Sequence, residues 1–309
     1  MQYPDPDEIL TGELGDWLEW VDGERRAATR KGLWRLALIL PVLWIAILVD
    51  IFGFDGEWQA IVVLGLPVTG LIFFWAQLPG KALFSSIKTE LNTQIAKELE
   101  LEYQAHPSSN FAFDCGTYFS LLPHHDRSFF ESLWIGEFEG RAFELIEVHL
   151  QKEHQRKNRR SWRTVFRGAL LSIETRSQFS GATLIRQKCG IRDWTETYVV
   201  DGPPSPIALG MDPVATGNAL FDEHFECHSE DPEEARRLVT SDVMNEIGRL
   251  TKRFGSRSIS AVFHDRHFAM FIESGNLFES GSYSKSTDRE RVEIAILQFA
   301  TIAEACRAV

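Results

Sequence analysis

Cysteine is scarce in this sequence, and the few cysteines form no motif. The 309 residues include four of them, which are Cys115, Cys189, Cys227 and Cys306. No pair has the C-x-x-C spacing that a zinc knuckle or a thioredoxin-like redox site needs, so both of these motifs are excluded. We expect the four separated thiols to be reduced and mostly buried, which suits a cytoplasmic domain.

Motifs for common catalytic chemistries are also missing. The chain has no Gly-x-Ser-x-Gly elbow, no phosphate-binding glycine loop and no His-Glu-x-x-His pair. The N-terminal stretch MQYPDPDEILTGELGDWLEW is acidic and lacks the basic and apolar regions of a secretory signal, so we expect no cleavage there. The sequence indicates no cofactor and leans away from an enzyme without excluding one.

Positive charge is in deficit over the chain as a whole. The formal net charge is −12, whereas a dedicated nucleic-acid binder needs clustered Lys and Arg to neutralise phosphates. A nucleic-acid partner is therefore not expected. Apolar residues make up 44% of the chain, which is enough for a sizeable core.

Two charge-free runs lie close together near the N-terminus. They are LALILPVLWIAILV at residues 36–49 and AIVVLGLPVTGLIFFWA at residues 60–76. With their apolar flanks each approaches the ~20 residues that span a bilayer core, and the proline in each is tolerated in a membrane helix. The pattern predicts a transmembrane helical hairpin over residues 33–78, in contact with the lipid bilayer. A pair of buried helices in a soluble protein is the alternative.

The positive charges predict the orientation of this hairpin. Several Lys and Arg residues precede the first run or follow the second, whereas the link between the runs carries only acidic charges. By the positive-inside rule, the chain would be a two-pass protein of the inner (cytoplasmic) membrane with both termini in the cytoplasm. Residues 1–32 would form an amphipathic pre-membrane helix. Residues 79–106 would form a long juxtamembrane helix that packs within the chain or pairs with a partner or a second copy.

From residue 107 to 309 the pattern changes to an α+β domain. Short β-like runs come first, including a hairpin with Glu-Gly at its turn, and they indicate a mainly antiparallel sheet. Asp231 and Thr240 are expected to cap two helices, with Glu234 completing a capping box at the first. A hairpin around HDRH and a C-terminal helix follow. A pleckstrin-homology-like barrel is one possible form of this arrangement, on analogy alone.

Several motifs resemble a family of two-span bacterial membrane proteins, domain-of-unknown-function family 3137. The stretches that carry the resemblance are FEGRAFELIEVHL, the charged run QKEHQRKNRR, TVFRGALLSIE with FSGATLI, FDEHFECHSEDPEEARRLVTSDVM, and the N-terminal DWLEWVDGERRAATRKG. The resemblance covers nearly the whole chain. It implies no established activity, and it suggests a LemA-like membrane protein as a partner.

A basic run stands out in the acidic chain. It consists of Lys152, Arg156, Lys157, Arg159, Arg160 and Arg163. One interpretation is a membrane-proximal loop attracted to anionic lipids, since each such charge near a membrane surface is worth roughly 1 kcal/mol. The other is a solvated hairpin loop.

Histidines and a cysteine provide weak candidates for a metal site. They are His224, Cys227 and His228 in HFECH, and His264 and His267 in HDRH. On a helix the first three would share one face and could bind zinc together with a histidine of the second group. On a strand, which the sequence favours, Cys227 would point away from His224 and His228.

Two functions follow from these observations. The first is a membrane-anchored cytoplasmic interaction or sensing module, acting as a non-catalytic subunit of an inner-membrane assembly. The alternative is a metal-dependent hydrolase that uses the scattered His and Cys residues. The two differ in whether the histidines converge in one pocket or lie dispersed over the fold.

Overall fold

The structure is a computed structural model that describes residues 12–53, 69, 71–72, 86–156, 159–188, 209–275 and 286–309. The chain divides into two compact units. The helical unit comprises Pro4–Ile95 and Glu279–Val292, and the sheet unit comprises Met1–Tyr3, Ala96–Phe278 and Glu293–Val309. The candidate site lies in the sheet unit.

The helical unit contains α2 (Glu13–Gly53), a continuous helix of 41 residues with Pro41 inside it. A second helix covers residues 86–98. Its residues Ile87, Leu91 and Ile95, which recur every four residues and so lie on one side of the helix, are buried. The helix predicted over residues 79–106 ends earlier than expected, because residues 102–104 form a strand. Its predicted start at residues 79–85 lies outside the described part of the chain.

The membrane-spanning hairpin predicted for residues 33–78 is wrong. Its first run is the second half of α2, whose preceding turns carry charged residues up to Arg35. Its second run, residues 60–76, lies almost entirely outside the described residues. No helix in the part of the chain that the structure describes has both the length and the apolar character needed to cross a membrane. The predicted two-pass inner-membrane location, with both termini in the cytoplasm, is therefore wrong as well.

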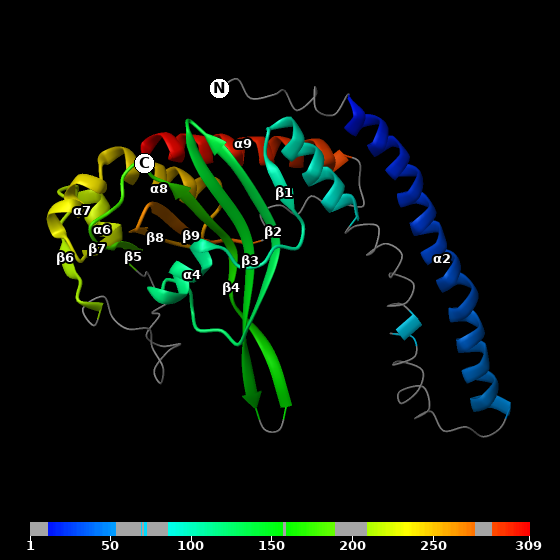
Figure 1. Cartoon of the computed structure of the whole chain (residues 1–309). Coiled ribbons are helices and arrows are strands. Elements are labelled where there is room, and N and C mark those ends of the chain that lie inside the picture. Colours follow the sequence, from blue (N-terminus) through cyan, green and yellow to red (C-terminus); the bar gives the residue numbers. More distant parts are fainter. Residues whose placement is uncertain are drawn as a thin grey trace. The chain divides into compact units, whose positions relative to one another are not determined.

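The sheet unit is built on an antiparallel sheet. Its described strands are β1 (Glu102–Gln104), β2 (Arg127–Phe138), β3 (Arg141–Arg156), β4 (Arg159–Glu174), β5 (Thr183–Gln187), β6 (Asp212–Val214), β7 (Phe225–Ser229), β8 (Ser258–His264) and β9 (His267–Glu273). They are ordered β1-β2-β3-β4-β9-β8-β5-β7-β6 (Figure 1). The order ends at β1 and β6, so the sheet is open and is not a pleckstrin-homology-like barrel. The antiparallel α+β class of this domain is as predicted.

Helices lie on both faces of this sheet (Figure 1). They are α4 (Phe111–Tyr118), α6 (Ala219–His224), α7 (Pro232–Leu238), α8 (Ser241–Arg253) and α9 (Ser286–Ala308). Residues in register point to the same face of a sheet. Trp134 and Leu145 are in register, and the Trp134 ring lies 4.9 Å from the ring of Phe299 in α9. We call this side the α9 face.

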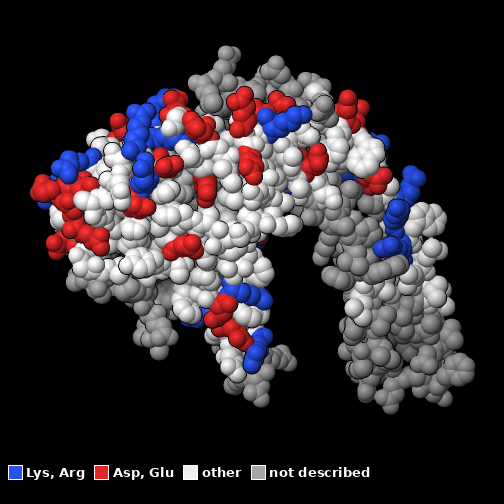
Figure 2. Space-filling model, viewed as in Figure 1, with Lys and Arg blue, Asp and Glu red and all other residues white. Residues whose placement is uncertain are grey.

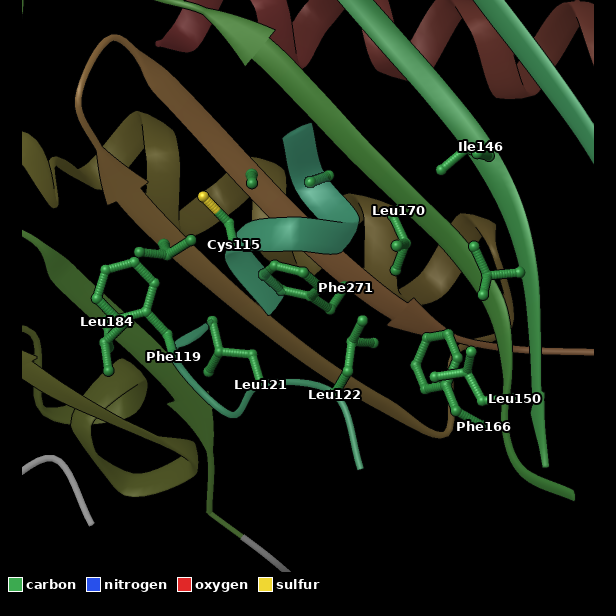
Figure 3. Close-up of a cluster of buried hydrophobic side chains, with 14 of the residues drawn as sticks. Cys115, Phe119, Leu121, Leu122, Ile146, Leu150, Phe166, Leu170, Leu184 and Phe271 are labelled. Atoms are coloured by element: carbon green, nitrogen blue, oxygen red, sulfur yellow. The ribbon is translucent and has the colours of Figure 1, made fainter. Parts of the chain in front are cut away.

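The opposite side, which we call the α4 face, contains a second hydrophobic core (Figure 3). Leu170 and Phe271 are neighbours in register, and they are covered by Cys115 of α4 and by Phe119 directly after this helix. Gly116 permits the close approach, because a Cβ at this position would lie 2.4 Å from the Phe271 ring. Both faces are therefore filled by packed apolar side chains over the centre of the sheet.

The local signals predicted the hairpins and helix starts correctly. The β2–β3 turn is Glu139-Gly140, with φ of 55° and 73°. Asp231 caps α7 and Thr240 caps α8, each by accepting hydrogen bonds from backbone N–H groups of the first turn. Glu234 departs from the expected capping box, because its carboxylate accepts hydrogen bonds from the backbone N–H and the hydroxyl of Ser180 in a neighbouring loop.

The β4–β9 pairing connects the N-terminal and C-terminal halves of the sheet. It begins where Gly168 is in register with Glu273. A Cβ at Gly168 would lie 1.9 Å from the carbonyl oxygen of Ile272, which is far inside any allowed contact. Glycine in the Phe-Arg-Gly stretch is thus required by a close backbone approach.

Gly168→Ala should lower the free energy of unfolding by about 3 kcal/mol or more, because the backbones of β4 and β9 must move apart. Urea unfolding followed by circular dichroism measures this change. Gly248→Ala is the matched control, since Gly248 lies within α8 and a Cβ there has no atom within 4 Å. The control should gain about 0.5–1 kcal/mol. Equal stability of Gly168→Ala and the unmodified chain would contradict the close approach.

The described cysteines are buried free thiols, as predicted. Burial raises the pKa of Cys115, Cys227 and Cys306 to about 12 in each case. The thiolate is the reactive form of cysteine, so all three should be inert in the folded protein.

We expect that, in a Cys189→Ser variant at pH 8, a thiol reagent labels none of these three cysteines in the native protein during the time in which it labels a free thiol in solution. In denaturant it should label all three, because unfolding removes the desolvation that suppresses ionisation. Mass spectrometry counts the labels. Rapid native labelling of Cys227 would show that the strand β7 opens or is less buried than the structure indicates.

Candidate functional site

The β3–β4 hairpin extends beyond both of its neighbours in the sheet (Figure 1). Pairing of β2 with β3 starts at Arg127 opposite Gln151, and pairing of β9 with β4 starts at Glu273 opposite Gly168. The strands β3 and β4 continue to pair with each other as far as Arg156 opposite Arg159. We call residues 152–164 the ribbon, and the residues where it leaves the sheet its root.

The ribbon contains every residue of the predicted basic run. Lys152, Arg156, Arg159, Arg160 and Arg163 are strand residues, so the run is not a loop. Lys157 lies outside the described residues. Figure 2 shows acidic and basic side chains next to each other on the projecting part, and Arg160 forms an ion pair with Glu153 at 3.2 Å.

Two β-bulges shape the root of the ribbon. The register of β2 against β3 shifts between Phe130 and Ser132, and that of β3 against β4 shifts between Leu150 and Gln151. The extra residues are Glu131 and Val165. Bulges bend a strand and increase its twist, and the Glu131 carboxylate is brought within 3.2 Å of the Arg167 guanidinium.

A chain of hydrogen bonds crosses the root on the α9 face. The Arg127 guanidinium donates to Gln151 Oε1 through Nε at 2.9 Å and Nη2 at 2.6 Å. The Gln151 amide nitrogen lies 3.2 Å from His149 Nε2. His149 Nε2 also lies 2.8 Å from the Thr164 hydroxyl. Three strands, β2, β3 and β4, thus contribute to one polar network.

The network defines the protonation state of His149. Arginine can only donate, so the carbonyl end of the Gln151 side chain faces Arg127 and its NH₂ group faces His149. His149 Nε2 must then accept a hydrogen bond, and the ring is neutral with its proton on Nδ1. Partial burial lowers the pKa of His149, and the nearby Arg167 guanidinium lowers it further, which favours the same neutral form.

Aromatic rings surround the arginine of this network. The Arg127 guanidinium lies 3.6 Å from the centre of the Trp162 ring and 5.3 Å from that of Phe129. Both rings remain accessible, with 42% of Trp162 and 45% of Phe129 exposed. Such cation–π contacts are worth about 0.5–1 kcal/mol at exposed positions, and here they hold the Trp162 side chain in a defined place.

The structure does not bring the proposed metal ligands together. His224 is the last residue of α6, whereas Cys227 and His228 are neighbours on β7 and therefore point to opposite faces. His264 and His267 flank the two-residue turn of the β8–β9 hairpin. Among the described residues, no group of three His, Cys, Asp or Glu side chains is arranged to hold a metal ion.

The histidines near α4 have aromatic neighbours instead. The His267 ring lies 4.1 Å from Phe111 and the His264 ring lies 5.0 Å from Phe119. Partial burial lowers the pKa of His267. These contacts belong to the packing of α4 against the sheet.

Sequence reasoning found the basic run but missed Arg127, Phe129, Gln151 and Trp162. A tryptophan inside a charged strand was the available signal. The alternation of Gln151, Glu153 and Gln155 on one side of β3 was a second one. The shifts at the two bulges, which bring these residues together, cannot be read from alternation.

The fold and the site define an α+β domain with an open antiparallel sheet and a projecting β-ribbon. The family model described as "Protein of unknown function (DUF3137)" matches residues 164–305 of the chain. The resemblance is thus confirmed for the Phe-Arg-Gly stretch and everything that follows it. The match does not extend to the charged run, the hairpin before it or the N-terminal helix.

Two further comparisons add little. No curated protein matches the chain. A solved structure titled "crystal structure of the mycobacterial trehalose monomycolate transport factor A, TtfA" is similar with 9% sequence identity and a TM-score of 0.38, over 73% of this chain and 96% of that one. A similarity at this level supports no inference about this protein.

His149 should titrate below its ordinary pKa of 6.5, because partial burial lowers this pKa and the nearby Arg167 guanidinium lowers it further. Protonation would also set an N–H against the Gln151 NH₂ group. Gln151→Glu should raise this pKa, because a carboxylate accepts from the protonated ring. A pH titration of the histidine NMR signals measures the pKa of His149 in the unmodified chain and in the variant. Gln155→Glu, farther along the same strand, is the control and should change the pKa much less.

The lowered pKa of His149 also predicts how the stability of the folded protein changes with pH. The unfolded chain takes up the His149 proton first as pH falls, so stability is lost as pH falls through about 6.5. An unshifted titration of His149 would contradict the hydrogen-bond network.

Proposed function

We propose that the sheet unit is a non-catalytic protein-interaction module that binds its partner through the root of the ribbon. The observation that supports this best is the exposed Trp162 ring held against the Arg127 guanidinium at 3.6 Å. The proposal does not include the membrane anchor expected from the sequence.

The composition of the root is that of a binding hot spot. Tryptophan and arginine are the residues most enriched where truncation to alanine costs 2 kcal/mol or more of binding energy. Trp162, Phe129 and Arg127 lie together, and the two rings are among the exposed large apolar side chains of the sheet unit. An exposed apolar patch next to fixed polar groups is typical of protein-interaction sites.

The root is also organised before any partner arrives. The hydrogen bonds from Arg127 to Gln151 and on to His149 fix side chains that would otherwise lose freedom on binding. Ordering a side chain at an interface costs about 0.5–1.5 kcal/mol. The network avoids part of this cost, which supports a binding role for the surface.

The dispersal of the metal-ligand candidates supports the same function over a metal-dependent hydrolase. Cys227 is buried on the α9 face, and His228 lies in register with Leu184, which belongs to the core of the α4 face. A hydrolase would need such groups to converge on one substrate. His264 and His267 instead contact Phe119 and Phe111 in the packing of α4 against the sheet.

Trp162→Ala and Arg127→Ala should each weaken partner binding by about 30-fold, the equivalent of 2 kcal/mol. A LemA-like protein, suggested by the family resemblance, is the first partner to test, by co-purification of the tagged full-length chain and then by biolayer interferometry. Leu220→Ala is the matched control, because Leu220 is 75% exposed and lies on α6, outside the root.

The outcomes are distinct. Loss of the same partner with both root variants and retention with Leu220→Ala would support the module. Unchanged binding by Trp162→Ala and Arg127→Ala would place the partner's site elsewhere and overturn the proposal. Equal loss with all three variants, at unchanged thermal stability, would also contradict a localised hot spot.

A further inference from the structure

The ribbon is a basic arm on an acidic protein. Residues 152–164 contain six Lys or Arg residues and one Glu, whereas the whole chain has a net charge of −12. Attraction between opposite charges acts within about 8–10 Å at physiological ionic strength. An anion that contacts only the ribbon is therefore attracted by its positive charges. A long polyanion would also be repelled by the acidic remainder of the chain.

Like charges face each other across the ribbon. Lys152 is in register with Arg163. Like charges directly opposite one another destabilise a strand pair. The Arg163 side chain is exposed and has no ion-pair partner among the described residues, so an anionic group placed beside it would relieve the repulsion.

The ribbon also offers an unpaired strand edge. Within the described part of the chain, residues 159–165 of β4 pair only with β3. The hydrogen bonds between β4 and the β9 side stop at Arg167, whose carbonyl accepts from the Ser274 N–H at 3.0 Å. On β3 the outer N–H of Glu153 is already bound to the Asp126 carboxylate at 2.6 Å. Among the residues that the structure describes, the outer edge of β4 is therefore more open to an added strand than that of β3.

We infer that the ribbon binds an acidic, extended segment of a partner protein, which adds to the outer edge of β4 at residues 159–165 and places carboxylates beside Arg163. This inference rests on the proposed interaction function and specifies its partner. The added strand would continue the line of β9. Strand addition uses main-chain hydrogen bonds for affinity and side chains for specificity.

A short acidic peptide fits these features better than nucleic acid. Nucleic acid has no backbone amides to pair with the β4 edge. Its affinity also depends on neutralising many phosphates, which a single basic arm on a chain of net charge −12 does not supply. A peptide uses both the edge and the charge.

The test uses the full-length chain and a labelled synthetic peptide of about eight residues, a usual strand length, with alternating Glu and Val. Fluorescence anisotropy should show binding that weakens as salt rises. A peptide of alternating Lys and Val should not bind. Hydrogen exchange at residues 159–165 should slow only with the acidic peptide.

Charge variants locate the contact. Arg163→Glu should weaken binding of the acidic peptide at least about tenfold, and Arg163→Gln should weaken it less. Arg236→Glu is the matched control, since Arg236 is an exposed arginine on α7 that pairs with Glu233 outside the ribbon. Thermal unfolding of each variant verifies that the fold is intact.

Equal binding of the acidic and basic peptides, or no effect of Arg163→Glu, would overturn the inference. So would binding of double-stranded DNA or of anionic phosphatidylserine vesicles by the ribbon in place of the peptide. In each of these cases the interaction function still stands if Trp162→Ala and Arg127→Ala release the protein partner. Retention of that partner by both variants would overturn the interaction function itself.

Discussion

The antiparallel pairing of β4 with β9 joins two parts of the chain that are about a hundred residues apart. On one side, β1 to β4 pair with their neighbours in sequence. On the other, β9 and β8 form a hairpin that continues into β5, β7 and β6. At the start of this pairing the two backbones approach so closely that Gly168 cannot have a side chain. Without this contact the described strands would form two separate sheets, β1 to β4 on one side and β9, β8, β5, β7 and β6 on the other.

The same pairing decides where the ribbon begins. Because β9 is bound only from Gly168 onward, the first half of β4 has no neighbour on its outer edge among the described residues. The bulges at Glu131 and Val165 occur at this level, where the two-stranded ribbon separates from the sheet. Arg127 and Trp162 meet at this point. The candidate site is thus a consequence of how far each strand extends.

Local signals predicted much of the fold, and their success has a physical cause. The Glu139-Gly140 turn and the caps at Asp231 and Thr240 depend on backbone conformation and hydrogen bonds within a few residues. Such features are present in any short window of the sequence. The hydropathy runs failed because a window reports composition only. It did not show that residues 36–49 continue a helix that begins at Glu13.

The sequence by itself determined the α+β class, the hairpins and helix starts, the burial of the cysteines and the basic character of residues 152–163. These properties follow from alternation, turn residues, capping and charge, all of which are local. Only the tertiary structure decided the strand order and the meeting of Arg127, His149 and Trp162. Those features depend on register and on bulges, where a shift of one residue moves a side chain to the opposite face of the sheet.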